Sequence, residues 1–196
     1  MVKKKPSRSP SRKTRVPAPR SASPPKSVIS RLAAGESRSN NVLRRQLGRL
    51  LRGEGAHLSY AEALRSFPVH LAGEKAHGVP HTAWQLLEHL RIAQADMIEF
   101  SRSPDHVSPA FPEGYWPATM EPPSAEAWND SVKAFLRDLD QFIKWVGSPR
   151  TALLADLHDG EGPPLLREAF LIADHNAYHL GQIVQIQRAL ESRAGA

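Results

Sequence analysis

The chain has 196 residues, contains no cysteine, and carries a net charge of +6 that is unevenly distributed. Residues 1–40 hold eleven Lys or Arg and one acid, whereas residues 41–196 hold fifteen basic and nineteen acidic residues. The lack of cysteine excludes disulfides, thiolate metal ligands and a cysteine nucleophile. No uncharged run approaches the roughly eighteen residues of a membrane span. We therefore expect a soluble, cytoplasmic protein without a membrane partner.

Residues 1–38 form a basic segment rich in Ser, Arg and Pro, with six prolines among the first twenty-five residues. Such a composition buries too little apolar surface to offset the entropy lost on ordering, so we expect a disordered tail. Its positive charge would allow weak, non-specific binding to nucleic acid. The alternative is a solvated extension without a fixed role, which is favoured by the lack of aromatic residues that could stack on bases.

The first three predicted helices are marked by residues that cap a helix N-terminus. Asn40 or Asn41 can cap a helix that closes at Gly53. Ser59 and Thr82 each stand three residues before a Glu or Gln, which is the pattern of a capping box. The first box opens a short helix that ends near residue 68, and the second opens a helix that runs to residue 101.

Two further helices complete the predicted fold. Ser124 starts a helix with apolar residues at every third or fourth position, and Gly147 ends it. Pro163 and Pro164 suit the first turn of a final helix that runs to Ser192. No segment alternates polar and β-branched residues as a strand does. We predict an all-α domain over residues 39–196, arranged as a four-helix bundle.

The last helix has two histidines on its predicted inward face. At 100° per residue, one arc of about 80° contains Leu165, Glu168, Ile172, His175, His179, Ile183, Ile186 and Leu190. A buried imidazole costs free energy unless it is hydrogen-bonded or bound to a metal. One inward histidine is usually a satisfied core residue. Two histidines one turn apart can direct their ring nitrogens at one point, which favours a divalent metal ion.

His89 is the third candidate ligand, because it faces the core from the helix that follows Thr82. Three imidazoles leave coordination positions open for water or substrate, as in a catalytic metal site. Glu168 is either a further ligand, a general base, or a first-turn acid favoured by the helix dipole. Asp96 has the same alternatives, with a surface charge as the preferred one. Residues that could orient the ligands are Asp174, Asn176, Tyr178 and Gln182.

A long loop, residues 101–123, contains six prolines and three aromatic residues. Loops of this length in a compact domain are often lids or binding loops. Trp116 in this loop is therefore a candidate to cover an apolar ligand above the metal. The alternative is that the aromatic side chains close one end of the bundle.

Two motifs resemble the DinB-like family of metal-binding four-helix-bundle proteins. They are W-x-L-L-x-H-L (Trp84–Leu90) and, about 85 residues later, D-H-N-x-Y-H-x-G-Q-I (Asp174–Ile183). The resemblance covers roughly residues 41–193 and implies that His89, His175 and His179 bind a divalent ion, often zinc or nickel. It also implies a reaction for some members, namely S-transfer with a low-molecular-weight thiol, isomerisation or hydrolysis. The basic tail is not part of the family pattern.

Three functions compete on this sequence. The first is a metal-dependent transferase or hydrolase acting on a small electrophilic substrate, which the open coordination favours. The second is a metal-dependent binding module without chemistry. The third is a nucleic-acid-associated protein that uses residues 1–38. The substrate is not specified, and a homodimer remains open.

Overall fold

The structure is a computed structural model that describes the backbone of residues 26–194 and the side chains of residues 37–193. Two units are distinguished by their internal contacts, Met1–Ser37 and Arg38–Ala196. All candidate site residues belong to the second unit. The predictions for residues 1–25, including disorder and contact with nucleic acid, lie outside the described residues.

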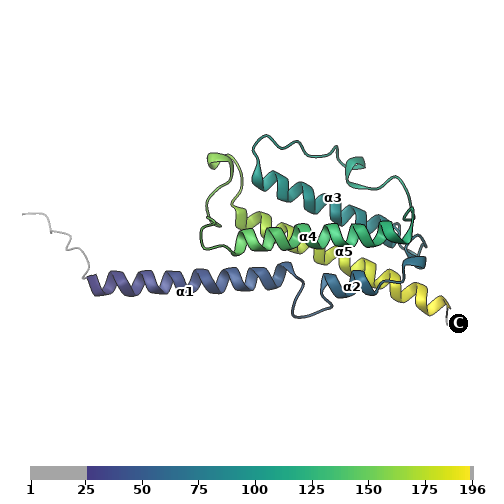
Figure 1. Ribbon diagram of the computed structural model, residues 1–196, viewed down its shortest axis with the longest axis horizontal. Helices are drawn as coiled ribbons and strands as arrows, with labels where there is room; N and C mark the ends of the chain where they lie inside the picture. The colour runs from purple at the N-terminus through teal and green to yellow at the C-terminus, as the bar shows by residue number, and fades with distance from the viewer. Residues whose placement is uncertain (1–25, 195–196) are drawn as a thin grey trace, which may run out of the picture. The chain divides into compact units, whose positions relative to one another are not determined.

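The described residues form five α-helices joined by loops that contain three short 3-10 helices (Figure 1). The α-helices are α1 (Lys26–Leu51), α2 (Tyr60–Ser66), α3 (Ala83–Arg102), α4 (Ala125–Gly147) and α5 (Leu165–Ala194). The 3-10 helices are η1 (Val69–Leu71), η2 (Glu113–Tyr115) and η3 (His158–Gly160). Between residues 26 and 194 no strand forms, and an isolated bridge joins Asp156 to Pro164. The prediction of an all-helical fold is confirmed.

The first helix differs from the prediction at its start. α1 begins at Lys26, and the predicted caps Asn40 and Asn41 lie inside it as exposed residues. The helix start predicted at Asn40 or Asn41 is therefore wrong, whereas disorder of residues 1–38 stays a prediction. No proline follows Pro25 before residue 68, and this stretch contains Ala, Leu and Arg, which favour helix. Because an asparagine in mid-helix can point to solvent, it does not require a helix start.

The capping residues predicted for the next helices are present. The Ser59 hydroxyl accepts from the backbone N–H of Glu62, and the Glu62 carboxylate accepts from the backbone N–H of Ser59, so both halves of the capping box form. Thr82 and Gln85 make the same reciprocal pair at the start of α3. The Ser124 side chain accepts from the backbone N–H of Ala127. These bonds satisfy N–H groups that have no partner within the helix.

The core lies between α3, α4 and α5, with α2 packed against α4 and α5. Fully buried side chains from these helices include Leu64, Leu87, Phe135 and Ile183. In Figure 1, α3 and α4 run in the same direction, and α5 runs in the opposite direction. The loop after α3 must therefore return along the whole length of that helix before α4 can begin. This return brings the predicted long loop beside the side chains of α3.

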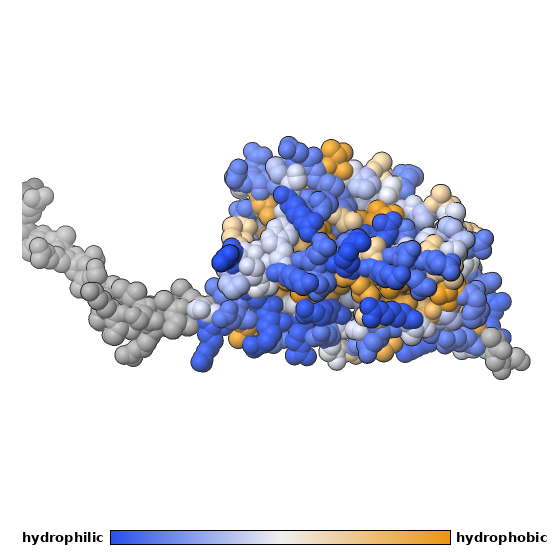
Figure 2. Space-filling view, viewed as in Figure 1, coloured by the Kyte–Doolittle hydropathy of each residue, from blue (hydrophilic) through white to orange (hydrophobic). Residues whose placement is uncertain are grey.

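The surface of the Arg38–Ala196 unit is mostly hydrophilic on the face drawn in Figure 2, with smaller hydrophobic patches between charged residues. Along α5, one strip of residues outside the arc of the two histidines is exposed: Arg167, Asp174, Tyr178, Gly181, Gln185 and Arg188. Within residues 26–194 no helix combines the length and apolar composition that crossing a bilayer requires.

The C-terminal half of α1 is held to the end of α4 by Arg44. Its guanidinium donates to the carbonyl oxygen of Val146 at 2.7 Å and to that of Thr151 at 2.6 Å. The two carbonyls belong to the last turn of α4 and the loop that follows. A planar guanidinium can serve both acceptors at once, which an ammonium on a flexible stem does less well. Leu47 and Leu51 are buried on the same helix.

Replacing Arg44 by leucine should lower the free energy of unfolding by about 1.5 to 3 kcal/mol, because two charge-assisted hydrogen bonds are lost. Arg45→Leu is the matched control, since Arg45 is exposed and should change stability by about 0.5 kcal/mol or less. Chemical denaturation monitored by circular dichroism measures both. Equal losses in the two variants would show that Arg44 does not anchor α1.

Candidate metal centre

The three predicted histidine ligands meet in the structure. His89 comes from α3, and His175 and His179 come from successive turns of α5, which packs against α3. One ring nitrogen from each residue can be chosen so that all three atoms lie within 4.8 Å of one another. No acidic side chain among the described residues joins this group. The three histidines could therefore hold a metal ion without a carboxylate ligand.

The ring of His89 is held by a hydrogen bond at Nδ1 and by an aromatic ring stacked on its face. Its Nδ1 lies 2.9 Å from the main-chain oxygen of Tyr115. Because a carbonyl oxygen only accepts, Nδ1 carries the proton and Nε2 of the neutral ring keeps a lone pair. The indole of Trp116 stacks on the same ring, with centroids 4.1 Å apart and planes at 5°. His81 stacks on the opposite face of Trp116 at 4.0 Å.

The ring of His179 is oriented by its own helix. Its Nδ1 lies 2.7 Å from Oε1 of Gln182, one turn further along α5. The amide oxygen accepts, so this contact again leaves Nε2 of the imidazole without a proton. The edge of Tyr178 packs against His179 at 4.9 Å, although Tyr178 itself is 65% exposed. Two of the residues predicted to orient the ligands, Gln182 and Tyr178, therefore contact His179.

The ring of His175 cannot satisfy both of its nitrogens with the hydrogen-bond partners that the structure provides. Its Nε2 lies 3.1 Å from Nε2 of His89. Since His89 uses its proton on Nδ1, these two nitrogens can share a hydrogen bond only if His175 carries a proton on Nε2. Its Nδ1 is buried and makes no well-formed hydrogen bond, and neither does Oδ1 of the adjacent Asn176. Burial of two such polar atoms without partners is costly.

A divalent cation resolves this conflict. With Nδ1 of His175 protonated, the lone pairs of His89 and His175 face each other and repel unless a cation lies between them. Two nitrogens bound tetrahedrally to zinc at about 2.1 Å are about 3.4 Å apart, which is close to the observed 3.1 Å. His179 completes three nitrogen donors, a set suited to zinc or nickel. The residues present therefore fit a metal ion.

Burial favours the neutral form of all three rings, which is the form that binds metal. Burial lowers the pKa of His175 to about 4, with smaller contributions from the neighbouring His179 and His89. Burial is also the largest cause of the lowered pKa of His89 and of His179. The histidines are therefore neutral at neutral pH and would leave the charge of a bound ion uncompensated.

Glu168 and Asp96 are not part of the cluster. Glu168 is 1% exposed, and its Oε1 accepts from Arg167 at 2.7 Å. It precedes His175 by two helical turns, about 10 Å along the axis. Asp96 accepts from His106 Nε2 and from the Tyr115 hydroxyl, both at 2.7 Å. Neither carboxylate belongs to the group of side chains that could hold the ion.

The remaining residues singled out in the sequence, Asp174, Asn176 and Trp116, differ in how they contact the three histidines. Asp174 is exposed, and its charge slightly raises the pKa of His175 against the larger effect of burial. Asn176 is fully buried beside His175. Both faces of Trp116 are occupied by histidine rings, so only its edge is available to a ligand.

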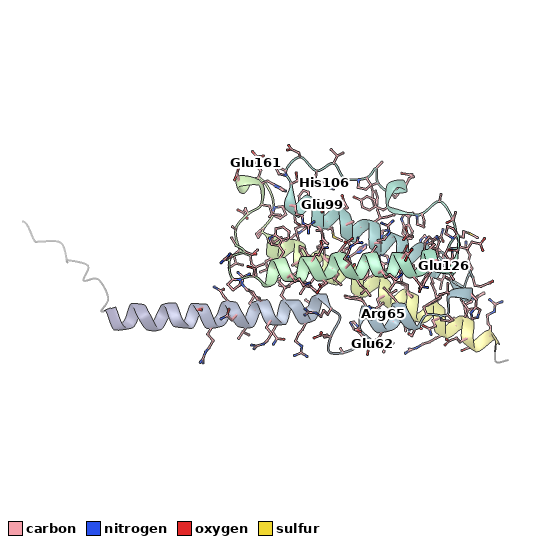
Figure 3. The ribbon with its side chains drawn as sticks, in the orientation of Figure 1. Glu62, Arg65, Glu99, His106, Glu126 and Glu161 are labelled. Carbon is pink, nitrogen blue, oxygen red and sulfur yellow. The ribbon has the colours of Figure 1, made fainter. Side chains whose placement is uncertain are left out.

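The long loop is attached to α3 through Asp96. His106 lies in the segment just after the end of α3 (Figure 3), while Tyr115 comes from η2. Both donate to the Asp96 carboxylate, so the loop is held at two points. Burial, together with the bond to Asp96, raises the pKa of Tyr115. This attachment places the Tyr115 carbonyl on His89, a main-chain contact for which the sequence carries no signal.

A groove on the surface lies beside Tyr178 and Gln182, the two residues that contact His179. Val79, Pro80 and neighbouring residues complete its lining, and none of the three histidines belongs to it.

The metal-free protein should become less stable as pH falls. The folded-state pKa of His175 lies near 4, below its ordinary value of 6.5. Between these values the unfolded chain binds more protons, so stability is full above pH 6.5 and is lost as pH falls toward 4. The lowered pKa values of His89 and His179 act in the same direction.

Urea denaturation in chelator at pH 7, 6 and 5 measures this dependence. Wild type should lose stability steadily, and His175→Gln should lose distinctly less over the same range. An identical pH dependence in the two proteins would contradict burial of a neutral His175.

Comparison with known proteins gives no match: no family model, curated protein or solved structure is similar to this chain. The resemblance carried by Trp84–Leu90 and Asp174–Ile183 is therefore not tested by these comparisons. What the site can do has to be judged from its own residues, namely three neutral imidazoles whose ring nitrogens converge.

Proposed function

We propose that this chain is a DinB-like metal-dependent enzyme that binds zinc or nickel through His89, His175 and His179. In this proposal, α3, α4, α5 and the part of α1 after Ser37 make a four-helix bundle around the site. The reaction is thiol transfer or hydrolysis on a small electrophilic substrate, with a low-molecular-weight thiol as co-substrate in the first case.

One observation carries the proposal: Nε2 of His89 and Nε2 of His175 face each other at 3.1 Å while the His89 proton is committed to Tyr115. A hydrogen-bonded structural pair of histidines would need no third ring. Here His179 brings a further nitrogen to the same place, and its Nδ1 is also occupied. Three imidazoles arranged in this way are expected where a cation is bound, because without one their burial costs free energy.

The number of ligands supports catalysis. Structural zinc sites are usually closed by four protein ligands, whereas catalytic sites have three and keep a position for water or substrate. A bound divalent ion would supply a Lewis acid that lowers the pKa of water or of a thiol. Because the three histidines are neutral, they do not weaken that effect with negative charge.

The chain's own residues would orient the ligands and shield the site. The Tyr115 carbonyl and the Gln182 amide hold protons on Nδ1 of His89 and His179, so that Nε2 of each ring points to the centre. Trp116 covers one face of His89 and keeps water from it. Substrate would approach along the groove that contains Tyr178 and Gln182.

A metal-dependent binding module without chemistry is the alternative that shares this site. It differs from the enzyme only in turnover, so metal binding alone does not separate the two. The nucleic-acid alternative rests on residues 1–38, most of which lie outside the described residues.

Added zinc or nickel should raise the melting temperature of the wild-type protein. A ligand at a hundredfold excess over its Kd stabilises the folded state by about 2.7 kcal/mol. For a domain of this size, that corresponds to about 5 to 10 °C. His89→Ala and His179→Ala should show no shift, although the two residues come from different helices. Differential scanning fluorimetry of chelator-treated and metal-loaded protein measures the change.

His70→Ala is the control for a general effect of losing a histidine, since His70 is exposed, lies in η1 and does not belong to the group of three histidines. It should keep the full metal-induced shift. A full shift in His89→Ala would remove His89 from the site and leave only the pair on α5.

Turnover should depend on the same residues. Full-length protein loaded with zinc or nickel should accelerate conjugation of a low-molecular-weight thiol to 1-chloro-2,4-dinitrobenzene, or hydrolysis of a p-nitrophenyl ester. Absorbance of the released or conjugated product gives the rate. His89→Ala and His179→Ala should lower it at least about tenfold, and His70→Ala should not. Metal binding without turnover on any such electrophile would favour the binding module.

A further inference from the structure

A line of buried amide groups runs from α4 through α3 to the metal centre. Nε2 of Gln94 lies 2.9 Å from the main-chain oxygen of Phe135 in α4. Oε1 of Gln94 lies 2.9 Å from Nδ2 of Asn176 in α5. Gln94 and Asn176 are both 0% exposed, although neither belongs to the cluster of three histidines. The burial of these two amide side chains beside the candidate metal centre needs a physical explanation.

The direction of every hydrogen bond in this line is determined by its first member. The Phe135 carbonyl can only accept, so the NH2 group of Gln94 must point toward it and the Gln94 oxygen must point away. That oxygen in turn accepts only, so Asn176 presents its NH2 group to Gln94. The Asn176 oxygen is then left on the other side of its amide, as a buried acceptor without a well-formed bond.

The natural donor for that acceptor is the neighbouring imidazole. Nδ1 of His175 is likewise buried and without a well-formed partner. An interaction with the Asn176 side chain raises the pKa of His175, against the larger lowering by burial. An Nδ1–H···Oδ1 bond between the two side chains would satisfy both buried atoms. The proton of neutral His175 then resides on Nδ1, and its Nε2 lone pair faces His89.

We propose that Gln94 is a positioning residue that selects the metal-binding tautomer of His175 by holding the Asn176 amide in one orientation. That His175 binds a metal rests on the proposed function, whereas the tautomer of His175 is a property of the metal-free protein. Without Gln94 the Asn176 amide can turn by 180° and present NH2 to Nδ1 of His175. That orientation requires a lone pair on Nδ1 and places the proton on Nε2, where it blocks the metal.

The three ligands thus obtain their orientation from different parts of the fold. His89 depends on the loop that carries Tyr115, and His179 depends on Gln182 in its own helix. Only His175, among these three, would be oriented through the core, by a line that starts on the backbone of α4. This difference predicts that a substitution at Gln94 affects one ring and leaves the other two unchanged.

The test uses long-range ¹H–¹⁵N NMR spectra of full-length, metal-free protein labelled at histidine nitrogens. These spectra distinguish Nδ1–H from Nε2–H for each ring. In wild type we expect His175 as the Nδ1–H tautomer. In Gln94→Met, which has a similar shape without polar atoms, His175 should shift wholly or partly to Nε2–H. His179 should not change.

Zinc affinity, measured by competition with a chromophoric chelator, gives a second readout. Gln94→Met should weaken zinc binding about tenfold or more, as expected when a residue that orients a ligand is lost. Gln94→Glu should recover most of the affinity, because a protonated buried glutamic acid can donate to Phe135 and accept from Asn176 as glutamine does. Gln94→Asn keeps an amide but is too short to reach both partners, so it should behave like Gln94→Met.

Ser101→Ala is the control for a buried polar group lost from the same helix, since Ser101 bonds only to the backbone of Met97. It should leave the His175 tautomer and the zinc affinity unchanged. An unaltered His175 tautomer in folded Gln94→Met and Gln94→Asn would overturn the proposal, as would the same tautomer change in Ser101→Ala. A tautomer shift in a protein whose wild type binds no zinc would support the role of Gln94 and refute the metal function.

Discussion

The approach of Nε2 of His89 to Nε2 of His175, at 3.1 Å, is the interaction on which the rest of the site depends. The Tyr115 carbonyl holds the His89 proton on Nδ1, and a proton on Nδ1 of His175 would leave both Nε2 atoms with lone pairs in the same space. Neutral rings in such an arrangement repel each other unless a cation intervenes. His179 adds a third donor to that space, and burial keeps all three rings neutral.

The fold produces this approach through the order of its helices. α5 runs opposite to α3, so the beginning of α3 meets the middle of α5, where the two histidines are one turn apart (Figure 1). Because α4 runs parallel to α3, the chain must return along α3 in a long loop. Asp96 holds this loop, and the loop places the Tyr115 carbonyl and the Trp116 ring on His89. His89 and the Tyr115 carbonyl that orients it are therefore brought together because α4 runs parallel to α3 and the loop between them passes along α3.

Much of this arrangement could be predicted from the sequence because it depends on local patterns. Capping boxes locate the starts of α2 and α3, and helical projection brings His175 and His179 to one face. The start of α1 at Lys26 could not be predicted from Asn40, because asparagine suits both a cap and an exposed position inside a helix. The contacts that orient the rings could not be predicted, since a main-chain acceptor such as Tyr115 leaves no trace in residue type. The role of Gln94 could not be predicted either, because its hydrogen-bond partners in α4 and α5 are known only once the helices are packed together.

X-ray absorption spectroscopy of the zinc-loaded protein tests the central claim most directly, because it counts imidazole ligands without depending on stability or turnover. A structure in which His89, His175 and His179 hold the ion predicts three imidazoles at about 2.0 to 2.1 Å and at least one light-atom ligand from solvent. A site with two or fewer imidazoles in wild type, completed by carboxylates, would contradict the account.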